Sequence, residues 1–150
     1  MSVEIRRAEA ADLPALLDLY EQLADGFGHR PASLEQAQAW LPEIAAQPGR
    51  ALLVGLHQGR VAGTVDLLIV SPNLTHAGRP WAIVENVVVD RRARRLGIGR
   101  ALMEEAVREA REAGCYELQL LSNRVRTEAH AFYRALGFQS SAEGFRLYMP

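Results

Sequence analysis

The chain has 150 residues, of which 49% are hydrophobic, and this length and share fit one globular domain and argue against disorder. Its formal net charge is -1, so no strong overall field attracts nucleic acid or an anionic membrane. All 17 basic residues are arginines, which excludes a lysine Schiff base, a lysine general base and the lysine of a phosphate-binding P-loop.

The number of cysteines and the lengths of the apolar segments indicate where in the cell the protein is expected. Cys115 is the single cysteine, so no internal disulfide can form. Residues 1–7 lack the apolar core of a secretion signal, and no apolar run reaches the roughly 18 residues of a membrane span. We therefore expect a cytoplasmic protein. The histidines and Cys115 are scattered along the sequence, so we expect no metal site.

The first third of the chain predicts a strand and two helices. Residues 3–7 alternate apolar and polar, as strands do, and apolar residues at helical spacing predict a helix over 13–24. The glycine-containing segment 25–31 predicts a loop. Ser33 and Gln36 form a capping-box pattern that opens a second helix. Its expected buried face consists of Ala37, Trp40, Leu41 and Ile44.

The middle of the chain predicts three strands. Apolar runs over 51–57 and 60–70 flank Gln58-Gly59, which predicts a tight hairpin. A polar loop over 71–80 then leads to a strand over 81–89 that is rich in Val and Ile.

The remaining residues complete the predicted fold. A helix over 98–113, a strand over 116–121 and a helix over 129–136 follow, and residues 138–149 predict one or two closing strands. The element order is that of an α/β (α+β) fold with a mixed, mostly antiparallel sheet of six to seven strands, about four helices and one β-α-β unit. We expect a single domain over residues 1–150.

A basic turn with two glycines, Arg94-Arg95-Leu96-Gly97-Ile98-Gly99, lies between a predicted strand and a predicted helix. The first N–H groups of a helix have no partner within it, and the helix dipole adds positive charge there, so an anion is favoured. Glycines let a phosphate approach, and Arg94, Arg95 and Arg100 add charged donors. The same pattern also fits an ordinary turn beside a solvated basic patch. Leu102 replaces the third glycine of a dinucleotide fingerprint.

Two blocks of the sequence resemble a known family. They are Val87-Val88-Val89-Asp90 followed by Arg94-x-x-Gly97-x-Gly99, and the downstream block Ala129-His130-Ala131-Phe132-Tyr133-Arg134-Ala135-Leu136-Gly137-Phe138. Together with the element order, they resemble the GCN5-related N-acetyltransferase (GNAT) superfamily. The resemblance implies an N-acetyltransferase that moves acetyl from acetyl-CoA to a primary amine by direct attack, without an acyl-enzyme.

The resemblance also implies a location for acetyl-CoA. The strand ending at Val89 and the strand over 116–121 would splay apart, the first would pair with the pantetheine arm, and amides from Arg95 to Ala101 would hold the pyrophosphate. The cofactor-binding residues expected on this basis are Val87, Val88, Val89, Arg94, Arg95, Leu96, Gly97, Ile98, Gly99, Arg100, Asn123, Arg126, Phe132 and Tyr133.

Glu85 and Tyr133 are the expected catalytic residues. A carboxylate inside an apolar strand is costly unless it faces a cleft or a partner, and burial of Glu85 would raise its pKa and suit it as a base. The resemblance implies that Glu85 is the general base, directly or through water, and that Tyr133 is the acid that protonates the departing thiolate. Regular alternation puts Glu85 on one face with Val87 and Val89, unless a bulge intervenes. An ion-paired surface Glu and a core Tyr are the structural alternatives.

The block before Tyr133 departs from part of the family. Members that acetylate ribosomal-protein N-termini usually carry Asn seven residues before the Tyr, where this chain has Arg126. Asn123 could supply the missing contact. The departure favours a small-molecule amine as acceptor. Arg126 could instead contact a phosphate of CoA or be a charge on a helix face, and His130 could tune Tyr133 or be structural.

The acceptor site and partners are less determined. The residues expected to bind the acceptor are Phe27, His29, His76, Trp81 and Glu85, with Tyr20, Asp25 and Asn73 as further candidates. Each could equally lie in a loop or a dimer interface, and dimers are common in this family, so a homodimer stays open. We expect no nucleic-acid partner, because no aromatic residues interleave the basic run, and no membrane partner. A non-catalytic acyl-CoA-binding or sensing module and a protein or peptide N-acetyltransferase are the alternative functions.

Overall fold

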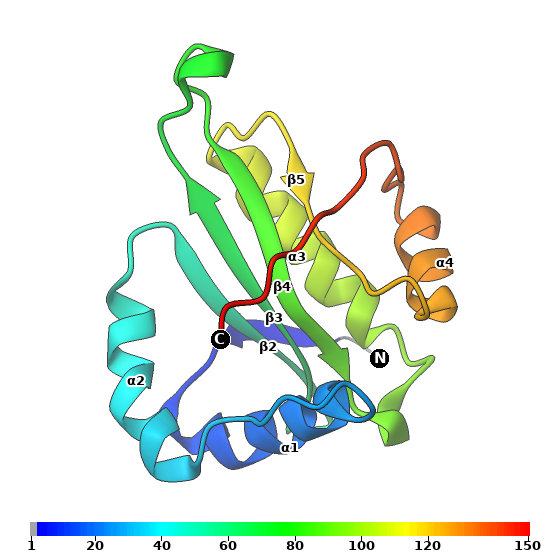
Figure 1. The fold of residues 1–150 in the computed structure, drawn as a ribbon. Coiled ribbons are helices and arrows are strands. Elements are labelled where there is room, and N and C mark those ends of the chain that lie inside the picture. The colour runs from blue at the N-terminus through cyan, green and yellow to red at the C-terminus, as the bar shows by residue number, and fades with distance from the viewer. Residues whose placement is uncertain (1–2) are drawn as a thin grey trace. The chain divides into compact units, whose positions relative to one another are not determined.

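The computed structural model describes residues 3–150, and Figure 1 labels their helices and strands. The described chain forms two compact units that divide between Gln119 and Leu120. The first unit contains β1 (Glu4–Arg7), α1 (Leu13–Ala24), α2 (Leu34–Ala46), β2 (Arg50–His57), β3 (Arg60–Val70), β4 (Trp81–Val89), α3 (Ile98–Glu112) and β5 (Leu118–Gln119). It also contains the short 3-10 helices η1 (Ala10–Asp12), η2 (Leu74–His76) and η3 (Arg91–Ala93). The second unit contains α4 (Thr127–Ala135).

The first unit is built on a five-stranded sheet in the order β1-β2-β3-β4-β5. Neighbouring strands are antiparallel, except that β4 and β5 are parallel and are connected through α3. The predicted hairpin is confirmed: Gln58 and Gly59 at its tip have φ of 52° and 74°, the conformation of the two-residue turn that matches strand twist. The mixed, mostly antiparallel sheet and the β-α-β unit confirm the predicted fold class.

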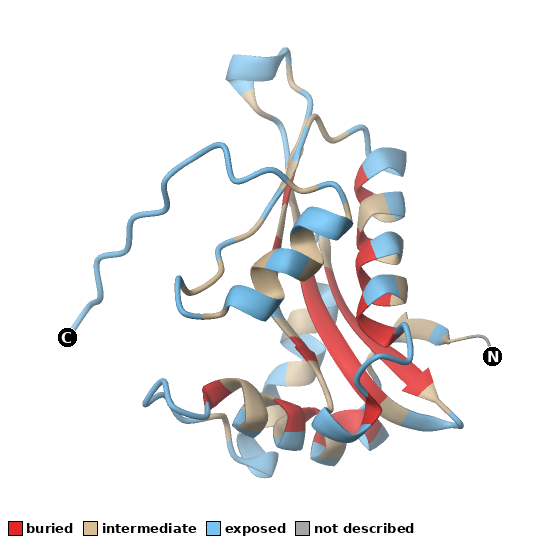
Figure 2. Ribbon diagram, turned by 90° about the vertical axis from the view of Figure 1, so that its right-hand side faces the viewer, coloured by how far each residue is buried: buried red, intermediate tan, exposed pale blue. Residues whose placement is uncertain are grey.

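Helices cover both faces of this sheet, and the buried residues follow its central strands (Figure 2). Leu13 of α1 packs with Leu52 and Val54 of β2. The neighbouring Gly55 faces the other side, where Ile98 of α3 approaches it. Because successive residues of a strand point to opposite faces, α1 and α3 lie on opposite faces. The helix α2 joins the α1 side through Ala37, Leu41 and Ile44.

The second helix begins as predicted but buries fewer residues. Ser33 Oγ accepts a hydrogen bond from the Gln36 N–H at 3.2 Å, and Gln36 Oε1 accepts one from the Ser33 N–H at 3.0 Å. The prediction that Trp40 belongs to the buried face is wrong, because Trp40 is 46% exposed. Leu41 and Ile44 lie on the stripe that meets the core, and Trp40 lies beside that stripe.

The second unit, residues 120–150, holds α4 and an extended C-terminal segment. The Tyr133 ring packs edge-on against Phe132 and Phe138, with ring centroids 5.3 Å and 5.9 Å away. The expected sixth and seventh strands over 138–149 are wrong for the described residues, where the sheet has five strands. Phe145 and Leu147 are 89% and 82% exposed. An alternating pattern becomes a strand only where its backbone bonds to a neighbouring strand, and none pairs with this segment in residues 3–150.

Within the described part of the chain, no helix is both long and apolar enough to cross a membrane.

Candidate functional site

Asp90 fixes the turn that leads from β4 toward α3. Its N–H donates to the Ala62 carbonyl at 2.8 Å, and its Oδ1 accepts a hydrogen bond from the Arg92 N–H at 2.9 Å. The Arg92 guanidinium lies 3.0 Å from Oδ2. The hydrogen bond from this side chain holds the pKa of Asp90 below its usual value, with the backbone N–H of Arg92 adding to the effect. The chain therefore leaves β4 in a defined direction.

Helix α3 begins with a glycine N-cap. Gly97 has φ of 83°, a left-handed conformation that is costly for residues with a Cβ, and it places no side chain over the helix start. The Ala101 N–H donates to the Gly97 carbonyl at 3.0 Å. The N–H groups of Ile98, Gly99 and Arg100 precede this bond and have no partner within the helix. The turn thus presents free donors at the positive end of a 15-residue helix, as an anion site requires.

Two glycines of the sheet allow α3 to lie close against the strands. A Cβ added at Gly63 would lie 2.9 Å from Ile98 Cγ2 and 3.0 Å from Leu102 Cδ1, and one at Gly55 would lie 3.1 Å from the same Ile98 atom. Ile98 and Leu102 are 1% and 0% exposed. The first turn of α3 is therefore seated in the core. No sequence signal marked Gly55 or Gly63, because their role depends on contact between distant segments.

The arginines around the turn differ in their partners. Arg91, Arg92 and Arg100 form ion pairs with Asp25 at 3.3 Å, Asp90 at 3.0 Å and Glu104 at 3.5 Å. Arg94 and Arg95 are exposed and form no ion pair within residues 3–150. These two side chains are consequently the ones available to a bound phosphate.

Strand β4 contains a bulge at Asn86. Asp66 of β3 pairs with Glu85, whereas Thr64 pairs with Val88, so two steps along β3 match three steps along β4. Asn86 takes up the extra residue with φ of 54°. A bulge of this kind redirects the side chains that follow it.

The bulge changes which side chains share a face with Glu85. Paired residues lie on the same face, and Asp66 is paired with Leu52, which belongs to the α1-side core. Glu85 and Val88 therefore lie on the α1 side, and the regular alternation that would group Glu85 with Val87 and Val89 does not hold. Glu85 is exposed on this face of the sheet.

The other edge of β4 is largely free of strand partners. Only Ala82 and Ile83 pair with β5, through Leu118 and Gln119. The predicted strand over 116–121 is thus much shorter in the structure. In the described residues, residues 84–89 of β4 have no strand partner on this edge, so their backbone groups there are not paired with β5. An extended amide-containing arm can pair with such an edge.

Asp66 is a buried carboxylate that the sequence pattern did not single out. Arg50 binds it through two hydrogen bonds, Nε to Oδ1 at 3.0 Å and Nη2 to Oδ2 at 2.6 Å, and the Asp66 side chain is 5% exposed. Burial raises the pKa of the nearby Tyr20 to about 12, and the Asp66 charge adds to this rise. Tyr20 is therefore a neutral phenol near neutral pH. The sequence did contain a signal for Asp66, because a single Asp inside an apolar strand indicates a carboxylate that needs a partner.

The residues expected to bind the acceptor lie in two places. Phe27 and His29 follow α1, whose Gln22 Oε1 accepts a hydrogen bond from the Arg91 N–H at 3.0 Å beside the turn. Trp81 begins β4 and His76 lies in η2 before it, at the far end of that strand (Figure 1). The structure therefore places Phe27 and His29 at one end of β4, and His76 and Trp81 at the other.

His76 and its loop are held by Tyr116, which lies two residues before β5. The His76 and Tyr116 rings stack with centroids 3.5 Å apart, and Asn73 Nδ2 lies 3.1 Å from the Tyr116 hydroxyl. These contacts give His76 and Asn73 a structural role in the loop before β4.

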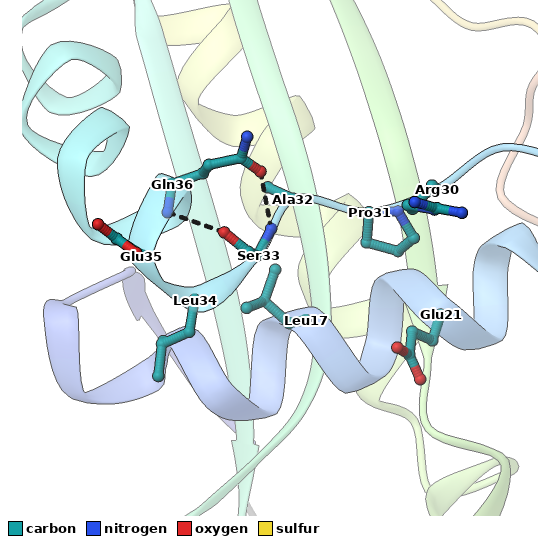
Figure 3. A pocket seen from close by; sticks show the side chains of 9 residues that line it. All are labelled: Leu17, Glu21, Arg30, Pro31, Ala32, Ser33, Leu34, Glu35 and Gln36. Carbon is teal, nitrogen blue, oxygen red and sulfur yellow. Dashed lines mark hydrogen bonds between the residues drawn. The ribbon is translucent and has the colours of Figure 1, made fainter.

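An open pocket of about 740 Å³ lies between α1 and the chain entering α2 (Figure 3). It contains none of the predicted site residues. Its charged side chains are Glu21, Arg30 and Glu35, and Ser33, the N-cap residue of α2, also lines it. The full lining is Leu17, Glu21, Arg30, Pro31, Ala32, Ser33, Leu34, Glu35 and Gln36.

In the second unit, Tyr133 is half-buried and His130 is tied to the preceding turn. Burial raises the pKa of Tyr133, and the Arg126 charge opposes that rise. His130 Nε2 lies 2.8 Å from the Asn123 carbonyl oxygen, so this nitrogen donates. Asn123 Oδ1 accepts a hydrogen bond from the Val125 N–H at 3.1 Å. The His130 and Asn123 side chains thus stabilise the turn before α4.

Comparisons with known proteins identify the family. A sequence model of the Acetyltransferase (GNAT) family matches residues 13–138. The chain belongs to the GNAT family. This confirms the resemblance drawn from the glycine turn and the Phe132-Tyr133 block, and it makes the chain an N-acetyltransferase. GNAT acetyltransferases use acetyl-CoA.

Relatives of this GNAT protein match over nearly its whole length. Glucosamine 6-phosphate N-acetyltransferase of Trypanosoma brucei brucei is 31% identical and covers 98% of this chain and 96% of its own length. The L-methionine sulfoximine/L-methionine sulfone acetyltransferase of Pseudomonas aeruginosa is 26% identical, covering 95% of this chain and 84% of its own. A solved structure from Agrobacterium tumefaciens str. C58 has a TM-score of 0.88 at 38% identity, covering 97% and 99% of the two chains.

Among residues 3–150, no group of three or more His, Cys, Asp or Glu side chains is placed to hold a metal ion.

Proposed function

We propose that this GNAT protein transfers acetyl from acetyl-CoA to the primary amine of a small molecule, by direct attack of the amine on the thioester. The glycine-capped start of α3 carries the cofactor part of the proposal, because its free N–H groups and the unpaired Arg94 and Arg95 fit a pyrophosphate. The full-length relatives that act on glucosamine 6-phosphate and methionine sulfoximine support a small acceptor.

The proposed cofactor site in the first unit uses the turn and the free edge of β4. The pyrophosphate binds the amides from Ile98 to Arg100, and the backbone from Val87 to Val89 pairs with the pantetheine arm. Leu96 lies within the turn and is 48% exposed, so it is accessible to a bound cofactor. In the second unit, considered by itself, Asn123, Phe132 and Tyr133 are further candidates for contact with the cofactor. The family match crosses Gln119–Leu120, which supports one acetyltransferase domain over residues 1–150.

The proposed chemistry needs one base and one acid. Glu85 takes a proton from the acceptor ammonium, directly or through water, so that the neutral amine can attack the acetyl carbonyl. Its exposure at the bulge supports access by an acceptor. Tyr133 then donates its phenolic proton to the departing thiolate. No covalent enzyme intermediate is required.

A thiol-release screen tests this proposal. The protein is mixed with acetyl-CoA and amino acids, amino sugars, aminoglycosides, polyamines, aminophosphonates or peptides, and free thiol is measured. Release with a small amine and not with peptides is the expected result. If acetyl-CoA raises the melting temperature while no amine releases thiol, the chain is a binding module and the proposal is wrong.

A further inference from the structure

Arg126 is an unusual residue for the start of a helix. It occupies the N-cap of α4, makes no side-chain capping hydrogen bond and forms no ion pair within residues 3–150. The N-terminal end of a helix carries partial positive charge, so a cation there is unfavourable. Short polar side chains such as Asn, Asp or Ser are preferred at this position. The needs of the helix itself therefore do not explain Arg126.

Tyr133 lies two turns further along the same side of α4. Seven residues span about 10 Å and return to nearly the same helical face. The Tyr133 ring is enclosed edge-on by Phe132 and Phe138, and its hydroxyl forms no hydrogen bond within the described residues. A phenolate formed in these surroundings would lack a neutralising partner unless a charge acts on it through space.

The other charged groups of the second unit have partners or are exposed. Arg124 pairs with Glu143 at 3.3 Å, and Arg146 lies 3.5 Å from the Tyr148 hydroxyl. His130 is bonded to the Asn123 carbonyl, and Glu128 and Arg134 are exposed on α4. Burial raises the pKa of Tyr133 and the charge of Arg126 lowers it, with no other group of this unit contributing.

We propose that Arg126 is a positioning residue for the acid step, which stabilises the phenolate left on Tyr133 after proton transfer. This inference rests on the proposed function. In the step, the C–N bond forms, the C–S bond of the thioester breaks, the proton of the Tyr133 hydroxyl passes to the thiolate sulfur, and the acylated nitrogen releases its surplus proton to water. Water afterwards reprotonates the phenolate. Arg126 offsets the negative charge during the interval and brings the acidity of the phenol closer to that of the thiol.

Two variants separate charge from helix capping. Arg126→Asn removes the charge but supplies a better N-cap, so α4 should be no less stable in thermal denaturation. Arg126→Lys keeps the charge. Each is titrated by the near-ultraviolet absorbance of tyrosinate, and subtraction of the same variant carrying Tyr133→Phe isolates Tyr133. Tyr133 should ionise at higher pH in Arg126→Asn and close to its native pH in Arg126→Lys.

Kinetics give the second measurement. Arg126→Asn should lower kcat roughly 10-fold and move its alkaline limb to higher pH, with little change in KM for acetyl-CoA, and Arg126→Lys should restore most of the rate. An unchanged Tyr133 titration in Arg126→Asn overturns the inference, as does a loss of acetyl-CoA affinity without a titration shift, which makes Arg126 a cofactor contact. The titration needs no turnover, so it tests the inference even if the thiol-release screen refutes the proposed function.

Discussion

Asp66 and Glu85 lie directly opposite each other on β3 and β4, at the last pair before the register shifts. One carboxylate is buried and bound by Arg50, and the other is exposed. The sheet thus holds two acids side by side but gives them different environments. Asp66 is held in an ion pair within the fold, whereas Glu85 is exposed and forms no ion pair within residues 3–150.

Asp66→Asn should destabilise the protein by about 3 kcal/mol, because it leaves the Arg50 guanidinium without its charged partner in a mostly buried site. Urea denaturation measures the free energy of unfolding. Asp25→Asn is the matched control, since its pair with Arg91 is largely exposed and should contribute little. Equal losses in the two variants would show that the buried pair has no special role.

Glu85→Gln should lower kcat/KM for the amine roughly 100-fold at neutral pH, since the amide cannot accept the ammonium proton. The affinity for acetyl-CoA should not change in a binding titration. Glu117→Gln alters an exposed carboxylate just before β5, and this control should keep native activity. Native kcat/KM in Glu85→Gln would remove Glu85 from the mechanism.

Arg94→Glu should weaken acetyl-CoA binding roughly 10-fold at low salt, and the effect should shrink as salt increases because the phosphate contact is screened. Calorimetric titration gives the affinity. Arg111→Glu makes the same charge change at the other end of α3 and should bind normally. Substitution of Gly99 is a less clean test, because Gly99 is buried in the first turn of α3. Equal effects of the Arg94 and Arg111 variants would point to net charge rather than to the turn.

Tyr133→Phe should lower kcat by about 100-fold while leaving the acetyl-CoA dissociation constant unchanged, because only the donated proton is lost. Steady-state kinetics at saturating amine measure the effect. Tyr148→Phe, at an 80% exposed tyrosine, serves as the control and should turn over normally. If both variants match the native rate, another group supplies the proton.

Asp12→Asn should flatten the acid-induced loss of stability. The side-chain hydrogen bonds from Arg6, the shorter at 2.7 Å, hold the pKa of Asp12 below its usual value, and the Glu9 N–H adds to this. A lowered folded-state pKa contributes stability above the unfolded value near about 4, and that contribution disappears as pH falls through the folded value. Unfolding measured from pH 7 to pH 2 follows it.

Glu9→Gln is the control for Asp12, because Glu9 lies 4.0 Å from the same guanidinium but is 69% exposed. This variant should follow the native pH profile. If Asp12→Asn retains the full acid dependence, the ion pair with Arg6 does not contribute to it.

Local signals in the sequence predicted much of this fold. The Gln58-Gly59 turn, the Ser33 cap and the start of α3 after Gly97 each depend on residues close in the chain, and all are confirmed. The bulge at Asn86 could not be located, because strand periodicity does not show where an extra residue enters. For this reason, the exposure of Glu85 and the residues that share its face could not be predicted from the sequence.

Other features depended on contacts that a linear pattern does not contain. Trp40 fits the apolar count of α2 but lies beside the stripe that meets the core. Asp66 has a clear role only once Arg50 is placed beside it. The alternation over 138–149 is typical of a strand, but strand formation also needs a bonded neighbour. The roles of Glu85, Arg94, Arg126 and Tyr133 stay predictions until the variants are measured.

If the start of α3 binds the cofactor as proposed, Ile98 links cofactor binding to folding. Its side chain fills the space left by Gly55 and Gly63, while its N–H is one of the free donors at the helix start. A change that loosens this residue would therefore reduce thermal stability and cofactor affinity together. The loop after α1 is exposed at residues 25–30, so variation there should carry little risk to the fold, and it should alter acceptor preference if Phe27 and His29 bind the acceptor as expected. A library aimed at new amine substrates should diversify that loop and leave the first turn of α3 untouched.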